Sequence, residues 1–106
     1  MAENELVLAL DAGTQSIRAL LIDFEGTIHG QVKTAVEPYF ATQPGWAELD
    51  PEYYYRKLCE TPKALFAKAG ARAKDVVAVT LATQRMTFVN VDREGRPLRP
   101  AIVWLD

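Results

Sequence analysis

The segment LALDAGTQSIRALLIDF, at positions 8–24, decides the fold because it places one short polar turn between two apolar runs. Residues 6–10 are continuously apolar, which is typical of an interior strand covered on both faces. Residues 17–24 form a second apolar run that contains a single arginine, Arg18. The pattern predicts two neighbouring strands joined by the DAGTQS turn, with the first strand in the middle of a sheet.

The chain beyond this segment predicts further strands and one helix. A glycine turn at 25–27 leads into residues 28–36. Apolar and polar residues alternate there, as in a strand with one solvent-exposed face. A helix is predicted from Pro51 to Gly70, with Asp50 as its N-cap and Gly70 as its C-terminal cap. Pro62 lies inside this helix, so we expect a kink or a break there.

Three more strands are predicted over residues 76–82, 86–91 and 101–104, the last two joined by the DREGRPL hairpin. Three strands, a helix and then another strand indicate an α/β fold whose mixed sheet begins with three antiparallel strands. No helix follows the last strand to cover the second face of the sheet. We therefore expect a domain that is incomplete at its C-terminus, the N-terminal piece of a longer protein.

Composition narrows the classes of partner. The 106 residues carry a formal net charge of −2 and no clustered run of lysine and arginine, which argues against nucleic acid or a membrane surface and favours a small molecule. The lone cysteine, Cys59, cannot form an internal disulfide, and residues 6–10 are too short an apolar run for a signal peptide or a membrane span. These features predict a cytoplasmic protein.

The polar turn has the chemistry of a phosphate site. Asp11 follows the buried strand, where its carboxylate can meet Mg²⁺ or water held by Mg²⁺. Gly13 lets the backbone approach a ligand closely. The planar guanidinium group of Arg18 can reach a phosphate bound at this turn. The remaining candidates offer backbone and side-chain donors at one bend: Thr14, Gln15 and Ser16. The alternative is an ordinary hairpin turn, because Asp and Gly are common in turns.

Three motifs together resemble the N-terminal domain of the FGGY carbohydrate kinases, a family that includes glycerol kinase, xylulokinase and gluconokinase. Positions 11–18 match D-x-G-T-x-S-x-R, positions 45–51 match G-W-x-E-x-D-P, and positions 95–106 match G-x-P-L-x-P-A-I-x-W-x-D. The motifs occur in the family's order, and from first to last they extend across most of the chain, from position 11 to position 106.

The resemblance implies an actin-like, ribonuclease-H-like domain that helps to transfer the γ-phosphate of ATP to a hydroxyl of a sugar, sugar acid or polyol. The residues implied along the ATP phosphates and Mg²⁺ are Asp11, Gly13, Thr14, Gln15, Ser16 and Arg18. Residues 1–106 would form the N-terminal part of the first actin-like domain. The second domain and the catalytic base would lie outside this segment, so we expect no turnover from it alone, and the resemblance leaves open a homo-oligomeric full-length protein.

The acceptor site is implied at two places, after the strand at 76–82 and at the last strand. The residues implied there are Gln84, Arg85, Met86, Trp104 and Asp106. In glycerol kinase the first place reads Gln-Arg-Glu-Thr, whereas a thioether, Met86, replaces the acid here. Because a thioether accepts hydrogen bonds only weakly, this disfavours glycerol and favours a sugar, sugar acid or alditol.

Other interpretations compete with the kinase assignment. Met86 and Trp104 are also typical of core-filling residues. The whole chain is compatible with a noncatalytic actin-like nucleotide-binding or regulatory module, although the segment at 95–106 favours the kinase.

Overall fold

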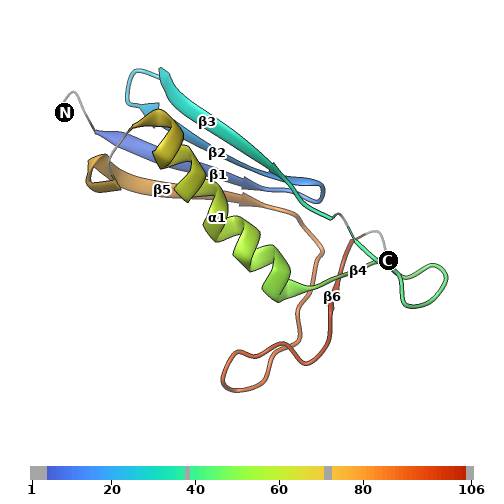
Figure 1. Ribbon diagram of the computed structural model, residues 1–106. Helices are drawn as coiled ribbons and strands as arrows, with labels where there is room; N and C mark the ends of the chain where they lie inside the picture. Colours follow the sequence, from blue (N-terminus) through green and yellow to red (C-terminus); the bar gives the residue numbers. More distant parts are fainter. Residues whose placement is uncertain (1–4, 38, 71–72, 105–106) are drawn as a thin grey trace.

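A computed structural model describes residues 5–37, 39–70 and 73–104 of the chain. Its main element is a mixed four-stranded sheet with the order β3-β2-β1-β5 and one helix, α1, lying across it (Figure 1). The elements of this unit are β1 (Leu6–Ala12), β2 (Ser16–Asp23), β3 (Ile28–Ala35), α1 (Pro51–Ala69), the 3₁₀ turn η1 (Ala73–Asp75) and β5 (Val76–Thr83).

Strand β1 lies in the interior of the sheet, as its apolar sequence predicts. It pairs antiparallel with β2 on one side and parallel with β5 on the other, and β2 continues antiparallel to β3. The predicted glycine turn between β2 and β3 is confirmed, with Gly26 at φ 89° and its amide donating to the Asp23 carbonyl at 3.1 Å. The antiparallel start and the α/β class are therefore as predicted.

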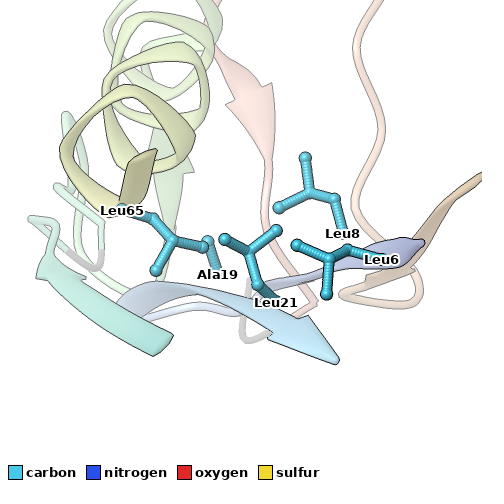
Figure 2. Close-up of a cluster of buried hydrophobic side chains, with 5 residues drawn as sticks. All are labelled: Leu6, Leu8, Ala19, Leu21 and Leu65. Atoms are coloured by element: carbon cyan, nitrogen blue, oxygen red, sulfur yellow. The ribbon is translucent and has the colours of Figure 1, made fainter. Parts of the chain in front are cut away.

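The core lies between α1 and one face of the sheet. Leu65, fully buried on α1, belongs to one buried cluster with side chains from β1 and β2 (Figure 2). The five residues of this cluster are Leu6, Leu8, Ala19, Leu21 and Leu65. On the opposite face of β1, Val7 and Ala9 are only partly buried among the described residues, as expected for a segment that lacks a helix to cover the second face of the sheet.

Helix α1 begins and ends where the sequence predicts. The Asp50 carboxylate accepts hydrogen bonds from the amides of Glu52 at 3.0 Å and Tyr53 at 3.4 Å, and Gly70 ends the helix in the left-handed conformation at φ 68°. The predicted break at Pro62 is wrong, since α1 runs as one helix, and the alternative of a kink there stays a prediction. Burial of the neighbouring Thr61 and of Leu65 against the sheet holds both halves of the helix in place.

The predicted strand over residues 86–91 is also absent. This segment makes only two isolated bridges, between Phe88 and Ile102 and between Val91 and Pro97. Met86 has a φ of 55°, in the left-handed region, and this turns the backbone out of an extended path at the position where the strand was expected to start. The hairpin turn that follows is present, because the amide of Asp92 donates to the Arg96 carbonyl at 2.9 Å.

The last predicted strand is shorter than expected and does not join the main sheet. It is β6 (Ala101–Ile102), which pairs antiparallel with β4 (Glu48–Leu49) beyond the N-terminal end of α1 (Figure 1). A second small core forms around this pair from Ala47, Leu49, Ala101 and Val103, with Tyr54 of α1 packed against it.

A buried carboxylate stabilises this second core. Glu48 is 3% exposed, and its carboxylate accepts hydrogen bonds from the Thr42 hydroxyl and from the Arg99 guanidinium at 3.0 Å. The hydrogen bond from Thr42 lowers the pKa of Glu48 below its ordinary value of 4.5, and the bond from Arg99 lowers the pKa further, against the opposing effect of burial.

We expect Glu48→Gln to remove part of the acid sensitivity of the full-length protein. A lowered pKa means that ionised Glu48 stabilises the fold above its unfolded pKa of about 4.5, and that this contribution is lost as the pH falls through the lower folded pKa. Melting temperatures over a pH series should fall less steeply for Glu48→Gln than for the wild type. Glu60→Gln is the control, since its exposed pair with Lys57 contributes little; equal slopes for all three proteins would contradict the prediction.

Candidate functional site

A cavity of about 360 Å³ opens where β1 and β5 end. Because the two strands are parallel, their carboxyl ends meet at one edge of the sheet, with Ala12 opposite Thr83. Its lining residues come from both strand ends and from the segment after β6: Asp11, Ala12, Gly13, Thr14, Thr83, Gln84, Arg85, Met86 and Trp104. The site thus brings together residues that lie more than 90 positions apart.

Seven of the eleven residues predicted for the two sites line this cavity. Asp11, Gly13 and Thr14 come from the predicted phosphate group, and Gln84 to Met86 and Trp104 from the predicted acceptor group. Gln15, Ser16 and Arg18 lie outside its lining, and Asp106 lies outside the described residues.

The turn at 13–16 is closed by its own backbone. The Gly13 amide donates to the Ser16 carbonyl at 3.0 Å, and the Gln15 carbonyl accepts from the Val36 amide at 3.0 Å. A Cβ at Gly13 would lie 3.1 Å from the Ser16 carbonyl oxygen, so a larger residue would crowd the closed turn and glycine favours it. Sequence reasoning assigned Gly13 to ligand approach, and the structure adds this local reason. The amides of Thr14 and Gln15 make no hydrogen bond to any described residue.

Two opposite charges flank this turn. Asp11 and Arg18 face each other directly across the β1–β2 pair, both are exposed, and neither side chain has a hydrogen-bond or ion-pair partner among the described residues. Directly opposed residues of an antiparallel pair share one face of the sheet. A carboxylate and a guanidinium are therefore available to a ligand beside free amides.

Three side chains from distant segments hold the turn in place. The Tyr54 hydroxyl of α1 donates to the Gly13 carbonyl at 2.6 Å, and the Gln84 side-chain amide donates to the same oxygen at 3.3 Å. The Trp104 indole N–H donates to the Thr14 hydroxyl at 3.1 Å. The orientation of Gln84 is fixed in turn by the Thr87 hydroxyl, which donates to its carbonyl oxygen at 2.9 Å.

Tyr54 is the member of this set that sequence reasoning missed. It lies in the run Tyr53–Tyr55, which predicts only packing of the helix. Its partner Gly13 is 41 residues away, so no local pattern signals the contact. Burial raises the pKa of the Tyr54 phenol above its ordinary value of 10, and the negative charge of Asp11 raises it further, although the hydrogen bond with Gln84 acts in the opposite direction.

The acceptor side of the cavity presents exposed side chains. Met86 is 68% exposed and Trp104 is 52% exposed, so neither fills the core formed by the described residues. The left-handed backbone of Met86 is a rare conformation for a residue with a long side chain, and such strain is concentrated at functional sites.

Comparison with known proteins identifies the family. Residues 6–106 match the model of the FGGY family of carbohydrate kinases, N-terminal domain. The chain belongs to the FGGY carbohydrate kinases. A glycerol kinase from Dechloromonas aromatica is 41% identical over 104 residues, which cover 97% of this chain and 20% of that protein.

Solved structures of FGGY kinases share the fold. A xyloylose kinase from Brucella ovis aligns with a TM-score of 0.90 at 30% identity, over 96% of this chain and 21% of that one. A Plasmodium falciparum glycerol kinase with ADP aligns with a TM-score of 0.70 at 28% identity, over 96% of this chain and 21% of that one. The β3-β2-β1-β5 sheet with its helix is therefore the actin-like α/β fold of the sugar kinases, and the chain spans about a fifth of the length of these relatives.

The residues of this FGGY segment fit Mg²⁺ only in part. Within the described ranges no group of three or more His, Cys, Asp or Glu side chains could form a cage for a metal ion. Mg²⁺ often needs no such cage, because one or two carboxylates, several waters and the phosphates of a nucleotide complete its shell. Asp11, exposed beside the free amides, suits that arrangement.

No helix in the described part of the chain is long and apolar enough to cross a membrane.

Proposed function

We propose that the full-length protein transfers the γ-phosphate of ATP to a hydroxyl of a sugar, sugar acid or polyol. The observation that supports this most is the cavity at the ends of β1 and β5, because it joins the predicted phosphate turn to the predicted acceptor residues. Family membership supports the kinase over a noncatalytic module. Phosphoryl transfer requires the donor and the acceptor to be held within bonding distance of each other, and a cavity shared by the two groups of residues supports such an arrangement.

The phosphate side of the proposed site is the turn from Asp11 to Arg18. The free amides of Thr14 and Gln15 are suited to phosphate oxygens, and the Arg18 guanidinium adds a planar, permanently charged donor. Mg²⁺ bound through Asp11 and its waters would neutralise charge on the phosphates. The chain's own contribution is to fix these donors before the nucleotide arrives, so that little reorganisation is needed during transfer.

The acceptor side is formed by Gln84, Arg85, Met86 and Trp104. The charged guanidinium group of Arg85 can donate hydrogen bonds to hydroxyls or to the carboxylate of a sugar acid. Met86 and Trp104 provide apolar surface for the C–H groups of the acceptor. We infer a sugar or sugar acid in preference to glycerol, since Met86 supplies no strong acceptor. Asp106 stays a predicted contact.

The rest of the proposed active site lies outside this chain. We infer that residues 1–106 form the N-terminal part of the first actin-like domain and that a second domain supplies the adenine pocket. The catalytic base also lies elsewhere, so the chain alone should show no turnover. We place the reaction in the cytoplasm, where ATP is available and where the exposed thiol of Cys59 stays reduced.

The test of the proposed function is a phosphorylation screen of the full-length protein. The protein is supplied with MgATP and with xylulose, gluconate, glycerol and a panel of other sugars, sugar acids and alditols, and ADP release is measured with a coupled assay. We expect turnover with a sugar or sugar acid, and glycerol among the poorer acceptors. Absence of turnover with every acceptor would overturn the proposed function.

Arg85→Ala should weaken the apparent affinity for the acceptor more than the affinity for ATP. The loss of a charge-assisted hydrogen bond corresponds to roughly 1.5–3 kcal/mol, or about 10-fold to 150-fold in KM for the acceptor. The measurement is steady-state kinetics with each substrate varied in turn. The control is Arg93→Ala, an exposed arginine in the hairpin turn away from the cavity. Equal losses for both substrates in Arg85→Ala would contradict its role.

Tyr54→Phe should raise the KM for MgATP about threefold to tenfold, the range expected for one neutral hydrogen bond. The substitution keeps the ring and removes only the hydroxyl that holds the Gly13 carbonyl. Tyr55→Phe is the matched control on the same helix, since the Tyr55 side chain is 63% exposed and away from the turn. A KM that is unchanged in both variants would show that the hydroxyl is dispensable for nucleotide binding.

A further inference from the structure

The Trp104 side chain touches both halves of the proposed site. Its indole N–H donates to the Thr14 hydroxyl on the phosphate side, and its ring lines the cavity beside Arg85 and Met86 on the acceptor side. Gln84, also on the acceptor side, donates only to the backbone carbonyl of Gly13. Among the described residues, Trp104 is therefore the one acceptor-side residue that hydrogen-bonds to a side chain of the turn.

The backbone just before Trp104 is anchored by packing and by a hydrogen bond. Val103 is 1% exposed, and its amide donates to the Ala47 carbonyl at 3.0 Å. Ala101, also 1% exposed, packs in the same small core. The indole is therefore attached to an anchored backbone, whereas the side chain itself is 52% exposed, so an acceptor packed on it can restrict its position further.

The hydrogen bond to Thr14 also fixes the direction of the Thr14 hydroxyl. An indole N–H can only donate, so the Thr14 oxygen is the acceptor in this contact. The hydroxyl proton of Thr14 is then available to a second acceptor. Beside the free amides of Thr14 and Gln15, a phosphate oxygen is the acceptor that the turn is suited to bind.

We propose that Trp104 is a positioning residue that couples the two substrates: an acceptor packed on the indole ring fixes the N–H, and this holds the Thr14 hydroxyl as a donor to the nucleotide phosphate. This inference rests on the proposed function and adds to it an energetic link between the sites. Such a link is reciprocal, so each substrate tightens the binding of the other by the same factor.

The test measures this factor in the full-length protein. The Kd of MgADP is measured by calorimetry without acceptor and with a saturating concentration of the best acceptor from xylulose, gluconate and the wider panel. The wild type should bind MgADP about threefold to tenfold more tightly with acceptor present, the range that one hydrogen bond supports. In Trp104→Phe, which keeps an apolar ring and loses the N–H, the factor should fall to about one.

Three further variants separate coupling from a general structural effect. Thr14→Val should lose the coupling as Trp104→Phe does, and the double variant should lose no more, because both changes remove the same bond. Thr14→Ser keeps a hydroxyl and should retain the coupling. Trp46→Phe, the same substitution at a ring that lies near Arg99 instead of the turn, should leave the factor unchanged.

The possible outcomes distinguish this inference from the proposed function. Wild-type turnover together with unchanged coupling in Trp104→Phe would overturn the role of Trp104 alone, as would a wild-type factor of about one. Additive losses in the double variant would show two independent effects and would also overturn it. Absence of wild-type turnover with every acceptor would overturn the proposed function itself.

Discussion

Asp11→Asn should reduce kcat/KM of the full-length protein at least about 100-fold, the scale on which one preorganised electrostatic contact acts on a transition state. Asparagine has the same size as aspartate but carries no charge, so it cannot neutralise or orient a divalent cation as the carboxylate does. Asp11 is exposed and its side chain has no partner in the described part of the chain, so the substitution should leave the fold intact. The measurement is the ADP-release assay with the best acceptor, accompanied by a melting curve.

The matched control for Asp11→Asn is Glu25→Gln. It also neutralises an exposed carboxylate, but in the hairpin at the opposite end of β2. Its activity should stay within about twofold of the wild type, as expected for a surface substitution away from the site. Comparable activity in Asp11→Asn and Glu25→Gln would rule out Asp11 as a contact for the metal.

Leu65→Ala should produce the largest loss of stability of any single core truncation on α1. Leu65 is fully buried in a cluster with side chains of β1 and β2, and truncation of such a leucine leaves a cavity that costs roughly 2–5 kcal/mol (Figure 2). The effect is measured by hydrogen exchange on peptides from α1 and β2 of the full-length protein, because exchange reports the local opening free energy.

Lys63→Ala provides the comparison for Leu65→Ala. It places alanine two positions earlier on the same helix, at an exposed site, and lysine and leucine have similar helix propensities. The expected change is within about 0.5 kcal/mol. Similar losses in the two variants would mean that helix propensity, and not packing on the sheet, determines the stability of α1.

The parts of the fold that could be predicted are those with local signals. The alternation in β3, the glycine turn at Gly26 and the two caps of α1 each depend on a few neighbouring residues. The prediction failed where tertiary contacts decide. Burial of Thr61 and Leu65 outweighs the cost of Pro62, and the left-handed backbone of Met86 removes a strand that the apolar residues of 86–91 favour.

In the candidate site, too, residues with local sequence signals could be predicted, and residues that depend on tertiary contacts could not. Asp11 to Arg18 could be singled out because the whole turn lies in one continuous segment. Tyr54 could not be identified, because its role depends on α1 lying across the sheet so that its hydroxyl reaches Gly13. The meeting of Thr14 and Trp104 likewise depends on pairing between segments 90 residues apart.

The parallel pairing of β1 with β5 has a consequence for the order of folding. The β1–β2 hairpin needs only neighbouring residues, and such local hairpins form within microseconds. The contact of β1 with β5 closes a loop of some 70 residues that includes all of α1, and long-range closure of this kind is slow. The phosphate-side turn is therefore expected to exist before its partner segment arrives, so a newly synthesised chain gains a complete binding pocket only at the end of folding.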